Sequence, residues 1–151
     1  MFISLKRNFM KMFREFLVYH NNSLEFRAKI ITLMISSNGE ISECEKQKLK
    51  EIAYSTYGDD EERAELLIGT VNEYHNKIIT NNGLNFEHLI QLVTREVRQI
   101  KRFHKKIDMD MLLQLHYCTT EEDDKLFQKR ILEFLQSLKD EYENGSKVKY
   151  E

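Results

Sequence analysis

The chain has 151 residues, with 23 lysines and arginines against 25 aspartates and glutamates, so its formal net charge is −2. Hydrophobic residues make up 41% of it, which supports one globular domain with its own core and excludes an intrinsically disordered protein. Because proline is absent and glycine occurs five times, little interrupts helix formation, and we expect an all-α protein.

The predicted elements begin with a basic amphipathic helix within residues 1–20. Lysine and arginine interrupt its apolar residues, so it lacks the continuous apolar core and the cleavage site of a secretory signal. No apolar run in the chain approaches the roughly 20 residues that cross a bilayer. The helix either docks on the domain or lies on an anionic membrane surface. Its candidate membrane-surface residues are Phe9, Lys11, Phe13 and Arg14.

A single helical domain is predicted over residues 21–143, giving a bundle of about seven helices in all. The expected helices cover 3–19, 24–36, the stretch from the Ser42 cap to Tyr57, the stretch from Asp59 to the turn at 81–83, 85–105, a short helix after Asp108, and a helix that begins at the Thr119 cap. The segment 24–36 is apolar nearly all round and should be central. Asn144-Gly145-Ser146 should end the last helix, which leaves 144–151 as a flexible tail.

Two stretches match the capping box, in which a Ser or Thr hydroxyl and a Glu carboxylate satisfy free backbone N–H groups. They are Ser42–Glu45 and Thr119–Glu122, and each is expected to begin a helix. An apolar helix precedes each box, and this recurrence suggests a weak internal two-fold repeat.

The two cysteines, Cys44 and Cys118, lie far apart in the sequence and form no CxxC motif. They also occupy different points of the weak repeat, which argues against a pairing by symmetry. We therefore expect no disulfide, a buried and inert Cys44 thiol, and a reducing, cytoplasmic compartment, with a location at the inner face of the membrane as the alternative.

The stretch from Ala28 to Leu49 resembles the signature of the TerB-like family of tellurite-resistance proteins and membrane-bound DnaJ-like cochaperones. That family typically reads Asp-Gly-Glu-Ile, a polar residue, then Glu-x-Glu, and this chain reads Asn38-Gly39-Glu40-Ile41-Ser42-Glu43-Cys44-Glu45. The resemblance implies an all-α domain with approximate two-fold pseudo-symmetry. It also implies a bacterial protein of a stress-response or envelope-linked assembly, whose acidic loop binds a metal or a partner.

The acidic loop departs from the family pattern at Asn38, which offers one neutral carbonyl oxygen in place of a carboxylate. A cation site here would be weak, so whether any metal binds is left open. Helix capping explains the same residues without any ligand. The candidate loop residues are Asn38, Gly39, Glu40, Glu43 and Glu45.

The sequence contains no pattern that predicts catalysis. The five histidines form no HExxH motif and lie beside no cysteine at zinc-ligand spacing. No nucleophile elbow and no glycine-rich phosphate loop is present. We therefore expect a protein that is not an enzyme and needs no cofactor.

The strongest surface feature is a run of basic residues on the predicted fifth helix. A sequence pI of about 6.2 argues against nucleic acid as the partner, so an acidic protein or a second subunit in a homodimer is favoured. The expected function is a non-enzymatic protein-interaction module, with a membrane-surface adaptor or a weak divalent-cation-responsive domain as alternatives. The candidate partner-binding residues are Arg95, Arg98, Lys101, Arg102, Lys105 and Lys106.

Overall fold

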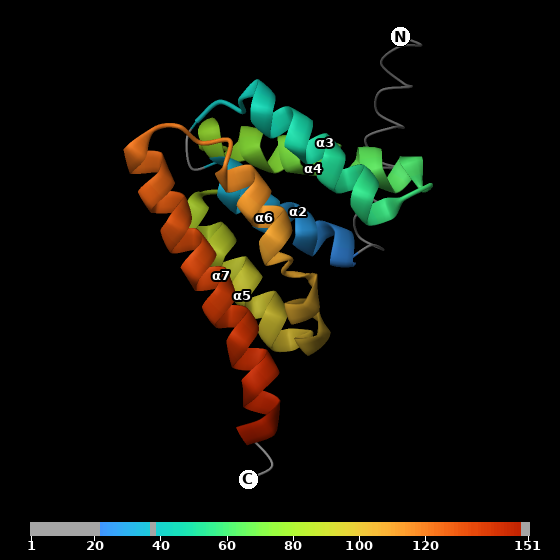
Figure 1. Ribbon diagram of the computed structural model, residues 1–151, viewed down its shortest axis with the longest axis vertical. Coiled ribbons are helices and arrows are strands. Elements are labelled where there is room, and N and C mark those ends of the chain that lie inside the picture. Colours follow the sequence, from blue (N-terminus) through green and yellow to red (C-terminus); the bar gives the residue numbers. More distant parts are fainter. Residues whose placement is uncertain (1–21, 37–38, 149–151) are drawn as a thin grey trace.

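The structure is a computed structural model that describes residues 22–36 and 39–148, with side chains as far as residue 143 (Figure 1). Helices follow one another throughout these residues, and no strand occurs among them, which confirms the predicted all-α class. The predicted helix at 3–19 lies outside the described residues. The elements are α2 (Asn22–Ile35), α3 (Glu43–Tyr57), α4 (Glu61–Ile79), α5 (Phe86–Gln99), the 3₁₀-helix η2 (Lys101–Lys106), α6 (Met109–His116) and α7 (Glu122–Val148).

Helix α2 is the centre of the bundle, as its apolar sequence predicts. Every residue from Ala28 to Ile35 is buried, including Lys29 and Thr32. Figure 1 shows α3 and α4 on one side of α2 and α5 and α7 on the other, and α2 contacts every described helix except α3 closely. A helix buried on all sides must be apolar all round, and this explains why α2 has no distinct polar face.

The helix boundaries follow local capping chemistry. Ser42 caps α3 through the predicted capping box with Glu45, and Gly58 ends the helix with a positive φ of 56°. Asp60, Asn85 and Asp108 each accept a backbone N–H bond at the starts of α4, α5 and α6.

The predicted helix over 85–105 is confirmed as α5 over its first part, but its predicted end is wrong, because the α-helix ends at Gln99 and the chain continues as η2. Ile100 leaves the helical conformation, with φ −123° and ψ 85°. A continuous helix would place like charges four residues apart, as in the pair Arg98 and Arg102, and such pairs destabilise an α-helix. The break also places Phe103 in the core, where its ring lies 5.0 Å from that of Phe26.

Both predicted ends of the last helix also differ from the structure. The Thr119 hydroxyl is buried and has no hydrogen-bond partner among the described residues, so the second capping box does not form. Helix α7 begins at Glu122 instead, after a turn in which the Thr119 N–H donates to the His116 carbonyl. It also continues through Asn144-Gly145-Ser146 to Val148, beyond the predicted end. Favourable i to i+4 hydrogen bonding can carry a helix through a single glycine at a cost of about 1 kcal/mol.

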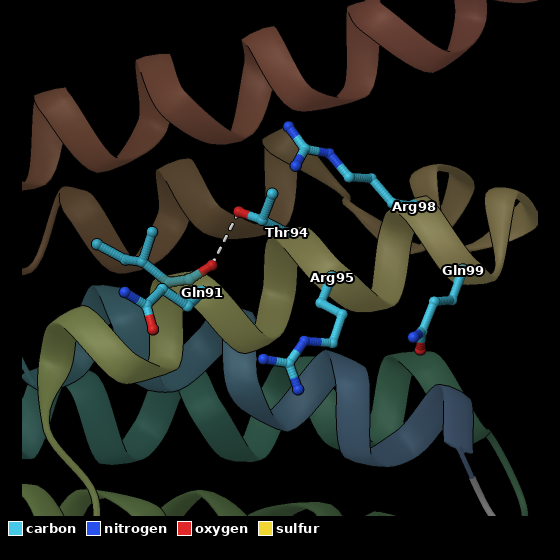
Figure 2. Close-up of a pocket in the computed structure, with 6 residues that line it drawn as sticks. Gln91, Thr94, Arg95, Arg98 and Gln99 are labelled. Carbon is cyan, nitrogen blue, oxygen red and sulfur yellow. Dashed lines mark hydrogen bonds between the residues drawn. The ribbon is translucent and has the colours of Figure 1, made fainter.

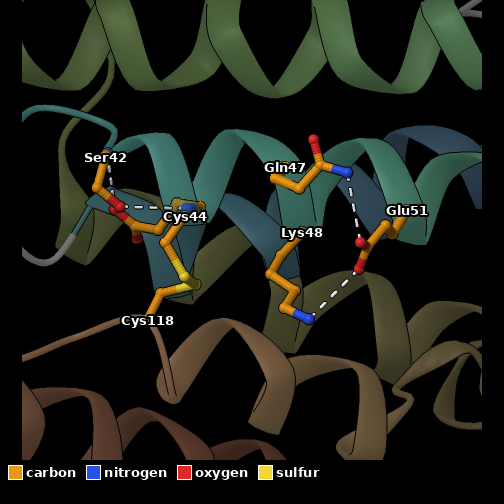
Figure 3. The surroundings of a disulfide bond; sticks show 7 residues. Ser42, Cys44, Gln47, Lys48, Glu51 and Cys118 are labelled. Carbon is orange, nitrogen blue, oxygen red and sulfur yellow. Dashed lines mark hydrogen bonds and ion pairs between the residues drawn. A yellow bond between two sulfur atoms is a disulfide. The ribbon is translucent and has the colours of Figure 1, made fainter.

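The expectation of two unpaired cysteines is wrong, because Cys44 and Cys118 form a disulfide (Figure 3). Their Cα atoms lie 5.6 Å apart although 74 residues separate them in sequence. Cys44 is exposed in the first turn of α3, and Cys118 follows the end of α6. The disulfide therefore joins the start of α3 to the end of α6. The packing of α3 against α6, which brings the two cysteines together, cannot be derived from their spacing.

We predict that Cys44→Ser lowers the free energy of unfolding of the oxidised protein by about 2–4 kcal/mol, because the bond restricts the unfolded chain across a long loop. Urea denaturation with and without dithiothreitol measures the difference. The reductant should lower the stability of the wild type by a similar amount and leave that of Cys44→Ser unchanged. Equal stability of the oxidised and reduced wild type would show that the bond contributes nothing.

Candidate functional site

The acidic loop between α2 and α3 is held by contacts from several helices. The Ser42 hydroxyl accepts a bond of 3.1 Å from the Glu45 N–H, and the Glu45 carboxylate accepts one of 3.1 Å from the Ser42 N–H. At the end of α2, the buried Gln128 amide of α7 donates to the Met34 carbonyl over 3.1 Å. The end of α2 before the loop and the start of α3 after it are therefore both held by hydrogen bonds.

His75 of α4 fixes the same loop from within. Its side chain is buried, its Nδ1 shares a hydrogen bond of 2.8 Å with the Ser36 hydroxyl, and the ring also bonds to the backbone of Gly39. A neutral imidazole can accept on one nitrogen and donate from the other, which suits these two partners. Burial lowers the pKa of His75 below its usual value of 6.5, and the bond to Gly39 opposes that shift.

The four loop residues that the structure describes differ in their surroundings. Glu45 is 1% exposed and completes the Ser42 capping box of α3, whereas Glu43 is exposed and pairs with Lys46 at 3.3 Å. Gly39 and Glu40 are exposed, and Asn38 lies outside the described residues. Within the part of the chain that the structure describes, no three histidine, cysteine, aspartate or glutamate side chains gather around a point where a metal could bind.

The predicted membrane-surface residues Phe9, Lys11, Phe13 and Arg14 lie outside the described ranges, so the membrane alternative stays a prediction. Among the described residues, no helix is both long and apolar enough to span a bilayer.

The basic residues lie on two elements instead of one continuous helical face. Arg95 and Arg98 belong to α5, whereas the other four belong to η2. Five of the six side chains are exposed, Lys106 is partly exposed, and none forms an ion pair with a described carboxylate. We call these five exposed residues the basic surface: Arg95, Arg98, Lys101, Arg102 and Lys105.

A groove of about 410 Å³ lies on α5 at this surface (Figure 2). Its lining is one apolar residue, Ile90, and five polar or charged residues, on the side of the helix turned away from the buried Val93 and Val97. Figure 2 shows the Arg95 and Arg98 side chains leaving the helix in different directions, so the groove has cationic edges. We call it the α5 groove, and its lining residues are Ile90, Gln91, Thr94, Arg95, Arg98 and Gln99.

A partly buried polar cluster around the buried Lys29 joins α5 to α2 and α4. The Lys29 ammonium of α2 is 2.6 Å from the Glu96 carboxylate of α5 and 3.3 Å from that of Glu25. The Tyr74 hydroxyl of α4 donates to Glu25 over 3.2 Å. Burial raises the pKa of Glu96, an effect that Lys29 opposes, and burial together with Glu25 raises the pKa of Tyr74. The cluster determines which face of α5 is turned outward.

Neither this cluster nor the role of the other four groove residues was predicted from the sequence; these residues are Ile90, Gln91, Thr94 and Gln99. Lys29 is surrounded by apolar residues in the sequence, and this signal could have indicated a buried charge in need of a partner. Gln91, Thr94 and Arg98 follow the helical period of the outer face, which could have extended the predicted surface.

Comparison with models of known protein families, with curated proteins and with solved structures finds no match to this chain. The resemblance to the TerB-like family and the internal repeat therefore stay predictions.

We predict that stability falls on acidification partly through His75. Because its pKa is lowered in the folded state, the unfolded state binds more protons, so the contribution of His75 is complete above pH 6.5 and is lost as the pH falls below that value. Thermal unfolding between pH 7.5 and 5.5 should therefore depend less on pH in His75→Gln than in the wild type. The exposed His88→Gln is the matched control, and equal pH dependence in all three proteins would contradict the prediction.

We also predict that Lys29→Met lowers the free energy of unfolding by about 3 kcal/mol, because it leaves the partly buried carboxylate of Glu96 without the ammonium that pairs with it. The double variant Lys29→Met/Glu96→Leu should regain most of this loss in urea denaturation. If the double variant is as unstable as the sum of the two single variants, the two side chains are not coupled.

Proposed function

We propose that the chain is a non-enzymatic helical module that binds an acidic segment of another protein molecule through the basic surface. The observation that supports this most directly is that five exposed cations line α5 and η2 without any ion pair to a described carboxylate. Isolated surface charges contribute little to folding, so a cluster of one sign is better explained by recognition of the opposite sign.

The groove adds selectivity to this charge. Ile90 and the Thr94 methyl group offer apolar contact between the two arginines, whose planar guanidinium groups can bind a carboxylate with two parallel hydrogen bonds. At the adjoining η2, the Arg102 guanidinium lies 5.6 Å from the centre of the Phe103 ring, which restricts its motion. Such a surface fits a carboxylate-bearing helix with one or two apolar side chains.

The biological setting that we propose is the one that the TerB-like resemblance implies, a bacterial stress-response or envelope-linked assembly, with tellurite resistance among its roles. The Cys44–Cys118 disulfide removes the reason for expecting a reducing compartment, because such bonds are rare in the cytosol.

Affinity capture from the source organism tests this function. We expect the wild type to retain a discrete protein that Arg98→Glu/Arg102→Glu does not retain, with at least a tenfold loss of recovery. Lys50→Glu/Lys77→Glu is the matched control, because it reverses two exposed charges on α3 and α4 and should bind as the wild type does.

Circular dichroism should give the same melting temperature for all three proteins within a few degrees, since none of the four side chains is buried. Equal recovery of every protein by the two variants would reject the basic surface as the binding site. Recovery of nucleic acid that salt removes would indicate a phosphate-binding surface instead.

A further inference from the structure

The start of α7 carries a surface opposite in charge to the basic surface. Glu121, Glu122 and Asp123 are exposed, and Asp124 is partly exposed. The one ion pair that the structure gives these four carboxylates joins Glu122 to Lys125 at 3.7 Å. Repulsion by Asp124 and the hydrogen bond with it raise the pKa of Glu121, so the charge at this end of α7 exceeds what its surroundings neutralise.

Two large apolar side chains lie next to these carboxylates on the surface. Leu126 is 55% exposed and Phe127 is 40% exposed, although most large apolar side chains of the described residues are buried. A single exposed leucine needs no explanation, but an apolar pair beside an excess of charge is typical of an interface. We call residues 121–124 together with Leu126 and Phe127 the α7 tip.

The α7 tip lies at one end of the helix that carries the α5 groove. The Phe127 ring lies 5.1 Å from that of Phe86, the first residue of α5, and Figure 1 shows α5 and α7 running from this common end in the same general direction. The groove then follows along α5 from Ile90 to Gln99. At 1.5 Å per residue, the distance along the helix from Phe86 to Arg98 is about 18 Å. The acidic α7 tip and the basic α5 groove are thus displaced from each other along the direction of α5.

We propose that a second copy of this chain occupies the α5 groove, with its α7 tip against the basic surface of the first. The inference rests on the proposed function, because it names the partner of the same surface. In an antiparallel arrangement about a two-fold axis that crosses the first half of α5, each tip faces the other copy's groove. Leu126 and Phe127 then contact Ile90 and Thr94, and the carboxylates of residues 121–124 face Arg95 and Arg98.

A second copy suits this surface better than an unrelated partner, because one chain carries both complementary halves. In a two-fold dimer every contact occurs twice, so each copy's α7 tip would meet the other copy's basic surface and both complementary pairs would form together. The net charge of −2 also means that two copies repel each other little as whole molecules.

Reciprocal charge reversal tests the proposal by sedimentation equilibrium. We expect the wild type to dimerise at low salt and to dissociate as salt is added. Glu122→Lys/Asp123→Lys alone and Arg95→Glu/Arg98→Glu alone should each raise the dissociation constant at least tenfold. An equimolar mixture of the two variants should again form dimers, because both contacts of the mixed pair then join opposite charges. Lys50→Glu/Lys77→Glu serves as the control and should dimerise like the wild type.

Reversal at the first turn of α7 also opposes the helix dipole, so Leu126→Asp provides a second variant that keeps the acidic turn and should likewise weaken the dimer. A monomeric wild type at every concentration, or dimers that neither reversal weakens, would overturn the proposal. If the wild type is monomeric while affinity capture still depends on Arg98 and Arg102, only the second copy is rejected as partner. If the wild type is monomeric and affinity capture does not depend on Arg98 and Arg102, the basic surface itself is rejected as a binding site.

Discussion

The burial of α2 on all sides is the constraint on which the rest of the structure depends. Its eight residues from Ala28 to Ile35 are covered by α4, α5, η2, α6 and α7, so these elements must pack around one helix. Burying one large apolar side chain stabilises the fold by about 1.5–3 kcal/mol, so the buried side chains of this helix supply a large part of the driving force for folding. The outward faces of the surrounding helices are therefore not needed to form the core.

Buried polar contacts determine the details that apolar packing alone would leave undefined. Lys29 orients α5 through Glu96, and Gln128 binds the carbonyl of Met34 at the end of α2. His75 holds the following loop through Ser36 and Gly39. An unpaired polar group in the core is costly, so each contact favours one arrangement over its alternatives. Glu45 also has a structural role, because its buried carboxylate accepts the Ser42 N–H in the capping box of α3.

Sequence reasoning predicted what depends on local chemistry and missed what depends on contacts between distant residues. The central position of α2 and the Ser42 capping box follow from patterns within a few residues, and both are confirmed. The Cys44–Cys118 disulfide joins positions 74 residues apart, and no local pattern indicates it. The break after Gln99 could have been suspected from the like charges of Arg98 and Arg102, but the docking of Phe103 on Phe26 could not. For the candidate site, the arginines were predicted and the α5 groove was not, because a groove is a property of packed side chains.

The helices packed around α2 thus form a scaffold that carries an α5 groove and an α7 tip of opposite charge. Hydrogen exchange measured by mass spectrometry at low and high protein concentration tests it most directly. We expect α2 to exchange most slowly at both concentrations, and slower exchange at high concentration only in α5 and the first turns of α7. Exchange in α2 as fast as at the α7 tip, or no dependence on concentration in α5 and α7, would contradict the account.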